Sequence, residues 1–155
     1  MKKLRNKAYR PKPVSKTSWH EAFTKRQTLD DDQQTDLSVA YRLAFQQMVS
    51  GHADEENWCV VVLSLNIALV LAEWGIGEEY IDRINGALEG AFRAKIRAGR
   101  TGKWGFDGEA IQAIKDVFEI HEEQLKLASK HEITSSLQEV HRRADAGHVF
   151  TEEVA

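Results

Sequence analysis

Cysteine and proline are both scarce in this chain of 155 residues. The single cysteine, Cys59, excludes an internal disulfide framework and a cysteine-rich zinc site, and it suits a reducing cytoplasm. The two prolines, Pro11 and Pro13, both lie near the amino terminus, so no proline interrupts a helix from residue 14 onward. No apolar stretch follows the cationic first residues, and we therefore expect no secretory signal peptide.

Acidic residues are missing from the first sixteen positions, which hold seven Lys and Arg residues. The rest of the chain holds 14 Lys and Arg against 24 Asp and Glu, a balance of −10 that the net charge of −3 conceals. Such asymmetry indicates an interacting segment rather than a fold. A polyanion, an acidic protein surface and the chain's own body all remain open as the partner of this basic arm.

Apolar runs long enough for a membrane are also lacking. The most apolar stretch, residues 58–72, is fifteen residues long and includes Ser64 and Asn66, whereas a bilayer span needs about twenty residues. Three consecutive valines at 60–62 would suit a strand, but the length of the stretch and its Leu and Ala content favour a helix. Because this helix is apolar on nearly every face, we expect it to be surrounded by other helices or by a second copy of the chain.

Apolar residues at helical spacing predict helices over residues 31–50, 54–74, 77–98 and 108–128. A fifth helix is predicted to begin at Thr134 or Ser135, where Ser135 and Gln138 match a capping box, and to end at Gly147. The predicted fold is all-α: a bundle of four to five helices around the buried apolar helix 54–74. The expected parts are an extended arm (1–16), a linker whose Trp19 and Phe23 could dock on the body (17–30), a helical domain (31–147) and an acidic tail (148–155).

Two features inside the predicted helices concern packing. In the first helix Leu37, Ala40, Tyr41, Ala44 and Met48 form one stripe that we expect to face inward. In the third helix Gly86 and Gly90 each cost about 1 kcal/mol relative to alanine. Either a neighbouring helix approaches them closely, or they are simply tolerated, and the sequence leaves both interpretations open.

Three segments carry a family resemblance: residues 7–14 (KAYRPKPV), 65–77 (LNIALVLAEWGIG) and 118–125 (FEIHEEQL). In this order they resemble a set of short reading frames common in proteobacterial phages and prophages. The shared segments are helix-packing patterns rather than reaction signatures. The resemblance therefore implies a phage or prophage origin, and it assigns no catalytic residue.

Two basic segments are the candidate partner-binding sites. In the arm, cations that could neutralise phosphates accompany a tyrosine that could stack on a base; these residues are Lys2, Lys3, Arg5, Lys7, Tyr9, Arg10, Lys12 and Lys16. The second segment combines cations and aromatic residues in and before a glycine-rich loop: Arg97, Arg100, Lys103, Trp104 and Phe106. Its alternative interpretation is that the cations favour a helix C-terminus and that Trp104 packs into the core.

Signatures of catalysis and of cofactor binding are lacking. The glycines of residues 99–105 follow a helix and lack the Gly-Lys-Ser/Thr ending of a phosphate loop, and the six histidines form no His-Glu-x-x-His motif. Cys59 lies in the most apolar helix, where we expect a buried thiol that is a poor nucleophile. We therefore predict no enzyme, no cofactor and no metal, although a metal site assembled from distant histidines stays open.

Taken together, these observations predict a non-catalytic phage or prophage protein that acts in the cytoplasm of a bacterial host. The expected partner is a host protein or a protein–nucleic-acid complex, which the chain regulates or inhibits; a defence complex is one example, which would make it an anti-defence inhibitor. The alternative is a nucleic-acid-binding accessory protein that uses the basic arm and the 93–104 stretch. We expect no membrane association, and a homodimer through the apolar helix remains open.

Overall fold

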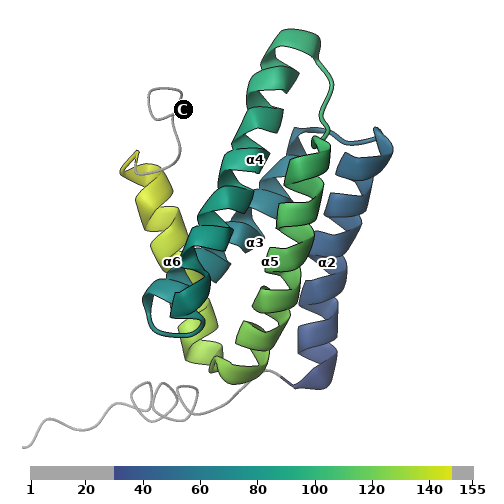
Figure 1. The fold of residues 1–155 in the computed structure, drawn as a ribbon. Coiled ribbons are helices and arrows are strands. Elements are labelled where there is room, and N and C mark those ends of the chain that lie inside the picture. The colour runs from purple at the N-terminus through teal and green to yellow at the C-terminus, as the bar shows by residue number, and fades with distance from the viewer. Residues whose placement is uncertain (1–29, 148–155) are drawn as a thin grey trace, which may run out of the picture.

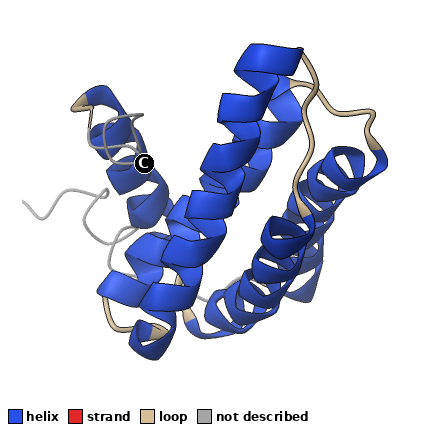
Figure 2. Ribbon diagram, turned by 45° about the horizontal axis from the view of Figure 1, so that its top comes forward, coloured by secondary structure: helices blue, strands red, loops and turns tan. Residues whose placement is uncertain are grey.

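The computed structural model describes residues 30–147, so the basic arm, most of the linker and the acidic tail lie outside the described part. Five α-helices and one short 3-10 helix form the described chain: α2 (Asp31–Ser50), α3 (Glu55–Glu73), η1 (Glu78–Tyr80), α4 (Ile81–Thr101), α5 (Gly108–Leu127) and α6 (Lys130–Asp145). The helices pack against one another as a bundle (Figure 1, Figure 2). The predicted all-α fold is confirmed, as is the choice of helix rather than strand for residues 60–62.

Helix α3 is the centre of the bundle, as predicted. It begins with a capping box in which Asp54 accepts a hydrogen bond from the N–H of Asn57 and the Asn57 side chain accepts one from the N–H of Asp54. It contacts α2, α4, α5 and α6. Its fully buried side chains include Val61, Leu65 and Leu71. Burial of one such side chain stabilises the fold by about 1.5–3 kcal/mol.

Helix α2 matches its predicted bounds, but its buried stripe differs from the prediction. The N-cap is Asp30, and Gly51 ends the helix with φ 81°. Leu37 and Ala40, which we expected to face inward, are exposed in the described structure. The stripe instead begins at Tyr41 and includes Phe45, whose ring meets the Phe118 ring edge-on at a centroid distance of 5.4 Å.

Helices α4 and α5 pack closely through Gly90, which is buried. A Cβ built at position 90 would lie 2.7 Å from the Cβ of Ala110 on α5, a distance that real side chains do not reach. Gly86 has no atom within 4 Å of its added Cβ. Close helix approach therefore explains Gly90, whereas Gly86 is simply tolerated.

Helix α6 begins earlier than predicted. Its N-cap is Ser129, whose hydroxyl accepts from the N–H of Glu132 at 3.1 Å, while the Glu132 carboxylate accepts from the N–H of Ser129 at 2.7 Å. The prediction of a start at Thr134 or Ser135 is wrong because Ser129-x-x-Glu132 matches the same capping motif six residues earlier. Further along α6, Arg143 joins Glu73 of α3 at 2.6 Å and Glu139 at 2.9 Å.

Candidate interaction surfaces

The predicted basic stretch forms the end of α4 and the loop that follows it. Two of its arginines are used within the fold: Arg93 Nε lies 3.1 Å from Asp107 Oδ2, and Arg97 Nη2 donates to the carbonyl of Gly105 at 2.9 Å. Arg97 Nη1 also reaches Asp107 Oδ2 at 3.4 Å. Hydrogen bonds from Arg93 and from the backbone N–H of Ala110 hold the pKa of Asp107 below its ordinary value. These contacts tie the loop to α4.

The two aromatic residues of this loop belong largely to the core. Phe106 is buried and stacks on Phe45 at a centroid distance of 5.9 Å. Trp104 is half-buried, its backbone pairs with Ala53, and its ring lies 5.7 Å from the Trp58 ring. The expectation that Phe106 offers its ring to a partner is therefore wrong. For Trp104 the structure favours the packing interpretation.

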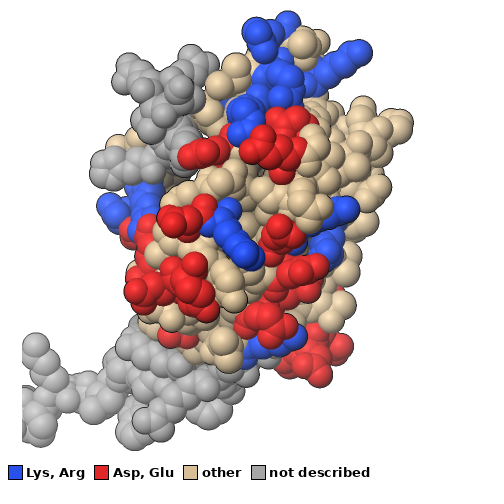
Figure 3. Space-filling view, viewed as in Figure 1, with Lys and Arg blue, Asp and Glu red and all other residues tan. Residues whose placement is uncertain are grey.

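Arg100 and Lys103 are exposed cations at this end of the molecule, and neither forms an ion pair with any residue between 30 and 147. Lys95 lies over the Trp58 ring at 5.2 Å. Figure 3 shows cationic side chains gathered at the top of the face that α4 and α5 form. We call Lys95, Arg100 and Lys103 the cationic end. The eight arm residues predicted to bind a partner lie outside the described residues.

Acidic side chains prevail over the rest of this body. Residues 30–147 contain 12 Lys and Arg against 21 Asp and Glu. Figure 3 shows many of these acids on the lower part of the same face. On this face cations gather at one end, and over the rest of it acidic side chains are more numerous than basic ones.

A hollow of about 400 Å³ lies in this anionic region, between the turn that precedes α4 and the second half of α5. Its polar lining includes the exposed carboxylates of Glu79, Glu119 and Glu123. Its apolar lining includes Tyr80, Ile76, Ile120 and Leu127, and Leu127 is 72% exposed. We call this hollow the acidic groove. Local sequence does not reveal this groove, because Glu79 and Glu119 come together from segments forty residues apart.

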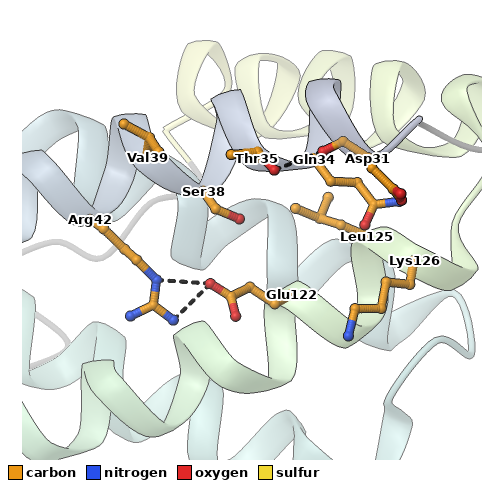
Figure 4. A pocket seen from close by; sticks show the side chains of 9 residues that line it. All are labelled: Asp31, Gln34, Thr35, Ser38, Val39, Arg42, Glu122, Leu125 and Lys126. Atoms are coloured by element: carbon orange, nitrogen blue, oxygen red, sulfur yellow. Dashed lines mark hydrogen bonds and ion pairs between the residues drawn. The ribbon is translucent and has the colours of Figure 1, made fainter.

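A second hollow, of about 380 Å³, is a polar cleft between the first half of α2 and the last turns of α5. Figure 4 shows Arg42 reaching across it to Glu122; Arg42 Nη2 lies 2.7 Å and Nε 2.8 Å from the same carboxylate oxygen. Lys126, also in its lining, pairs with Glu123 at 2.5 Å. The two cations of the lining, Arg42 and Lys126, are therefore already paired, and Asp31 is the charged side chain of the lining that has no ion pair among the described residues.

A third hollow, of about 180 Å³, is almost wholly apolar. Leu37 and Ala40 of α2, Val60, Leu63 and Ile67 of α3, and Ile133 of α6 contribute to its lining. Tyr41, Ser64, His121 and Leu125 complete it. We call this hollow the apolar groove.

A buried polar network joins α3, the turn that follows it, and α5. The side-chain amide of Gln124 donates to the carbonyl of Ile76 at 2.7 Å and to that of Ala68 at 3.0 Å. The Oε1 atom of Gln124 can then only accept a hydrogen bond. We therefore place a proton on His121 Nδ1, which lies 3.0 Å away and donates to Oε1. Burial lowers the pKa of His121, and the hydrogen bond to Gln124 opposes this shift only in part. The network is structural, and no local sequence pattern indicates the role of Gln124.

Cys59 is exposed, so the expectation of a buried thiol is wrong. Partial desolvation, followed by the nearby carboxylate of Glu55, raises the pKa of the Cys59 thiol above its ordinary value. A raised pKa leaves little thiolate at neutral pH, which makes this thiol a weak nucleophile. Within residues 30–147 no group of three or more His, Cys, Asp or Glu side chains comes together to hold a metal ion.

No family model, curated protein or solved structure matches this chain. One helix of the described part, α3, is long and apolar enough to cross a membrane by length and composition alone. Core helices of soluble proteins meet the same criterion, and α3 packs against four other helices.

Proposed function

We propose that this chain is a non-catalytic protein of phage or prophage origin that binds a host protein in the bacterial cytoplasm and regulates or inhibits it. Its partner would be a protein with a cationic surface, and a defence complex that binds nucleic acid is one such protein. The single observation that carries the proposal is the acidic groove, in which exposed carboxylates of Glu79 and Glu119 surround apolar side chains.

The chemistry of the acidic groove suits a protein segment better than a nucleic acid. An apolar side chain of a partner could fill the space beside Ile120 and Leu127, while its Lys or Arg residues meet Glu79 and Glu119. Interfaces of this kind combine an apolar centre with a charged rim. A phosphate backbone would be repelled by the same carboxylates. The groove therefore favours a cationic, partly apolar protein surface.

Inhibition follows from charge and shape together. A protein groove that binds nucleic acid is lined with cations, and an anionic helical body can occupy it and exclude the natural ligand. The described domain has nine more acids than cations. Long-range attraction would speed the encounter, and contact at the acidic groove would fix the orientation.

The test is affinity capture from a bacterial host lysate, followed by measurement of Kd with the captured protein. The groove variant is Glu79→Lys with Glu119→Lys. The control is Asp116→Lys with Asp145→Lys, which changes the net charge equally at exposed sites outside the lining of the acidic groove and of the apolar groove. We expect the wild type and the control to capture the same protein, and the groove variant to bind it at least about tenfold more weakly, a loss of about 1.4 kcal/mol. Equal capture by all three proteins, or no capture at all, contradicts the proposal.

A second candidate function is that of a nucleic-acid-binding accessory protein. The observation that favours it is the cationic end, where Arg100 and Lys103 are exposed and lack ion pairs within residues 30–147. A gel shift with duplex and single-stranded DNA over a range of salt concentrations tests it. Binding that weakens as salt rises, and that is lost in Arg100→Glu with Lys103→Glu or on removal of residues 1–16, supports this function. Absence of binding at low salt rules it out.

A further inference from the structure

Helix α3 is apolar on nearly all sides, yet the described chain covers it only in part. Of its most apolar 18-residue window, 39% is buried. The half-buried side chains of Val60, Leu63 and Ile67 form one wall of the apolar groove. An uncovered apolar wall on a central helix indicates a surface that another segment covers.

The opposite wall has the same character. Leu37 and Ala40 continue the apolar stripe of α2, but Leu37 is 42% exposed and Ala40 is also exposed. Their spacing is that of a buried helix face, and residues 30–147 do not bury it. The α2 wall and the α3 wall of the apolar groove are therefore both left partly uncovered by residues 30–147.

We propose that residues 17–29 of this chain cover the apolar groove, with Trp19 and Phe23 in contact with its walls. These residues directly precede Asp30, the N-cap of α2. Leu37 lies seven helical residues beyond Asp30, a rise of roughly 10 Å. Phe23 lies seven residues before Asp30, and seven residues reach at most about 24 Å. The segment is thus long enough to turn back along α2 and reach the groove.

The composition of the segment matches the groove. Trp19 and Phe23 are four residues apart, the spacing that places two side chains on one face of a helix. The segment also contains Lys25 and Arg26 with one acid, Glu21. It therefore combines large apolar side chains with a positive charge.

The charges beside the groove distinguish this occupant from a second copy of the domain. Asp36 and Glu56 lie one helical turn from Ala40 and Val60, and neither has an ion pair within the described residues. Lys130, one turn before Ile133, is the neighbouring cation on α6. Two copies joined through this groove would bring four such carboxylates together, whereas Lys25 and Arg26 would offset them.

The test uses the full chain with isotope-labelled Ile and Leu methyl groups. We expect nuclear Overhauser contacts from the Trp19 and Phe23 rings to the methyl groups of Leu63, Ile67 and Ile133, within one molecule. Trp19→Ser with Phe23→Ser should abolish these contacts and shift the groove methyl resonances, while helical circular dichroism stays unchanged. The matched control is Leu127→Ser, which removes an exposed apolar side chain elsewhere and should leave the groove resonances in place.

Two results would overturn the inference. One is the absence of these ring contacts in the wild type together with groove resonances that do not move in the Trp19→Ser, Phe23→Ser variant. The other is contacts that appear only between labelled and unlabelled molecules in a mixed sample, which would make a second copy the occupant. If the double variant loses helical structure, the intramolecular contacts of the wild type decide the question alone. The outcome is independent of the partner assay for the acidic groove, because the two surfaces share no residue.

Discussion

Gly90 of α4 and Ala110 of α5 meet where no larger pair of residues would fit. A Cβ at position 90 would approach the Ala110 Cβ to 2.7 Å and its Cα to 3.1 Å. A glycine inside a helix lowers helix stability, so its presence here reflects tertiary packing that outweighs local preference. Gly86, one turn earlier, faces open space and provides a natural control.

Substitution of these glycines by alanine should have opposite effects. Gly90→Ala forces α4 and α5 apart, and overpacking of this kind costs about 1–3 kcal/mol, more than the gain of up to about 1 kcal/mol in helix propensity. Gly86→Ala keeps the propensity gain without a clash and should raise the free energy of unfolding by up to about 1 kcal/mol. Urea unfolding of the two variants measures both changes. A Gly90→Ala protein as stable as Gly86→Ala would show that the close approach does not matter.

Local sequence signals predict much of this bundle. Three helices have an aspartate at the N-cap: Asp30, Asp54 and Asp107. A carboxylate there accepts a hydrogen bond from a free N–H group of the first turn, and this preference does not depend on how the helix packs. The central position of α3 also follows from sequence, since a helix that is apolar on nearly every face packs against several neighbouring helices. The helix starts depend on residues within about one helical turn, and the central position of α3 depends on the composition of that helix alone, so both can be predicted from local sequence.

The surfaces could not be predicted in this way. The acidic groove joins Glu79 to Glu119 across forty residues, and no local pattern reports that they share a hollow. In sequence, Phe106 and Arg97 resemble exposed recognition residues. In the structure Phe106 is buried in the core, and Arg97 donates a hydrogen bond to the carbonyl of Gly105. Where two capping motifs compete, as at Ser129 and Ser135, local sequence does not decide between them.

Gln124 should be among the most sensitive polar residues of the described core. Gln124→Ala leaves the carbonyls of Ala68 and Ile76 without their side-chain donor and removes the acceptor of His121. Each buried polar group left unsatisfied costs about 1–3 kcal/mol. We expect the free energy of unfolding to fall by at least about 2 kcal/mol in urea unfolding. Gln112→Ala, which removes an exposed hydrogen bond to Asp116, should change it by less than about 0.5 kcal/mol; similar losses in both variants would contradict the role of the network.

His121 should make the fold less stable in mild acid. Because burial lowers the pKa of His121 in the folded chain below its ordinary 6.5, the unfolded chain binds the proton first as pH falls. The contribution to stability is therefore complete above about pH 6.5 and decreases below it, by about 1 kcal/mol between pH 7.5 and 5.5. Unfolding measured at both pH values should show this loss in the wild type and a smaller one in His121→Asn. The control His141→Asn, at an exposed position of α6, should keep the wild-type difference; an unchanged pH response in His121→Asn would exclude His121 as its source.

Asp107 serves α5 and α4 at once, and two substitutions separate its roles. Its Oδ1 accepts from the N–H of Ala110 at 2.8 Å as the N-cap of α5, while Oδ2 pairs with Arg93 and Arg97. Asn is also a good N-cap, so Asp107→Asn should lose only the partly exposed ion pairs, worth up to about 1 kcal/mol. Asp107→Ala loses the cap as well and should cost about 1–2 kcal/mol more.

Salt provides the independent readout for this pair of variants. Because the ion pairs are partly exposed, added salt should reduce the difference in stability between the wild type and Asp107→Asn. The difference in stability between Asp107→Asn and Asp107→Ala should persist in salt, because the cap is a hydrogen bond within the first turn of α5. Urea unfolding at low and high salt measures both differences. Equal stability of Asp107→Asn and Asp107→Ala would mean that the charge, rather than the cap, is what Asp107 contributes.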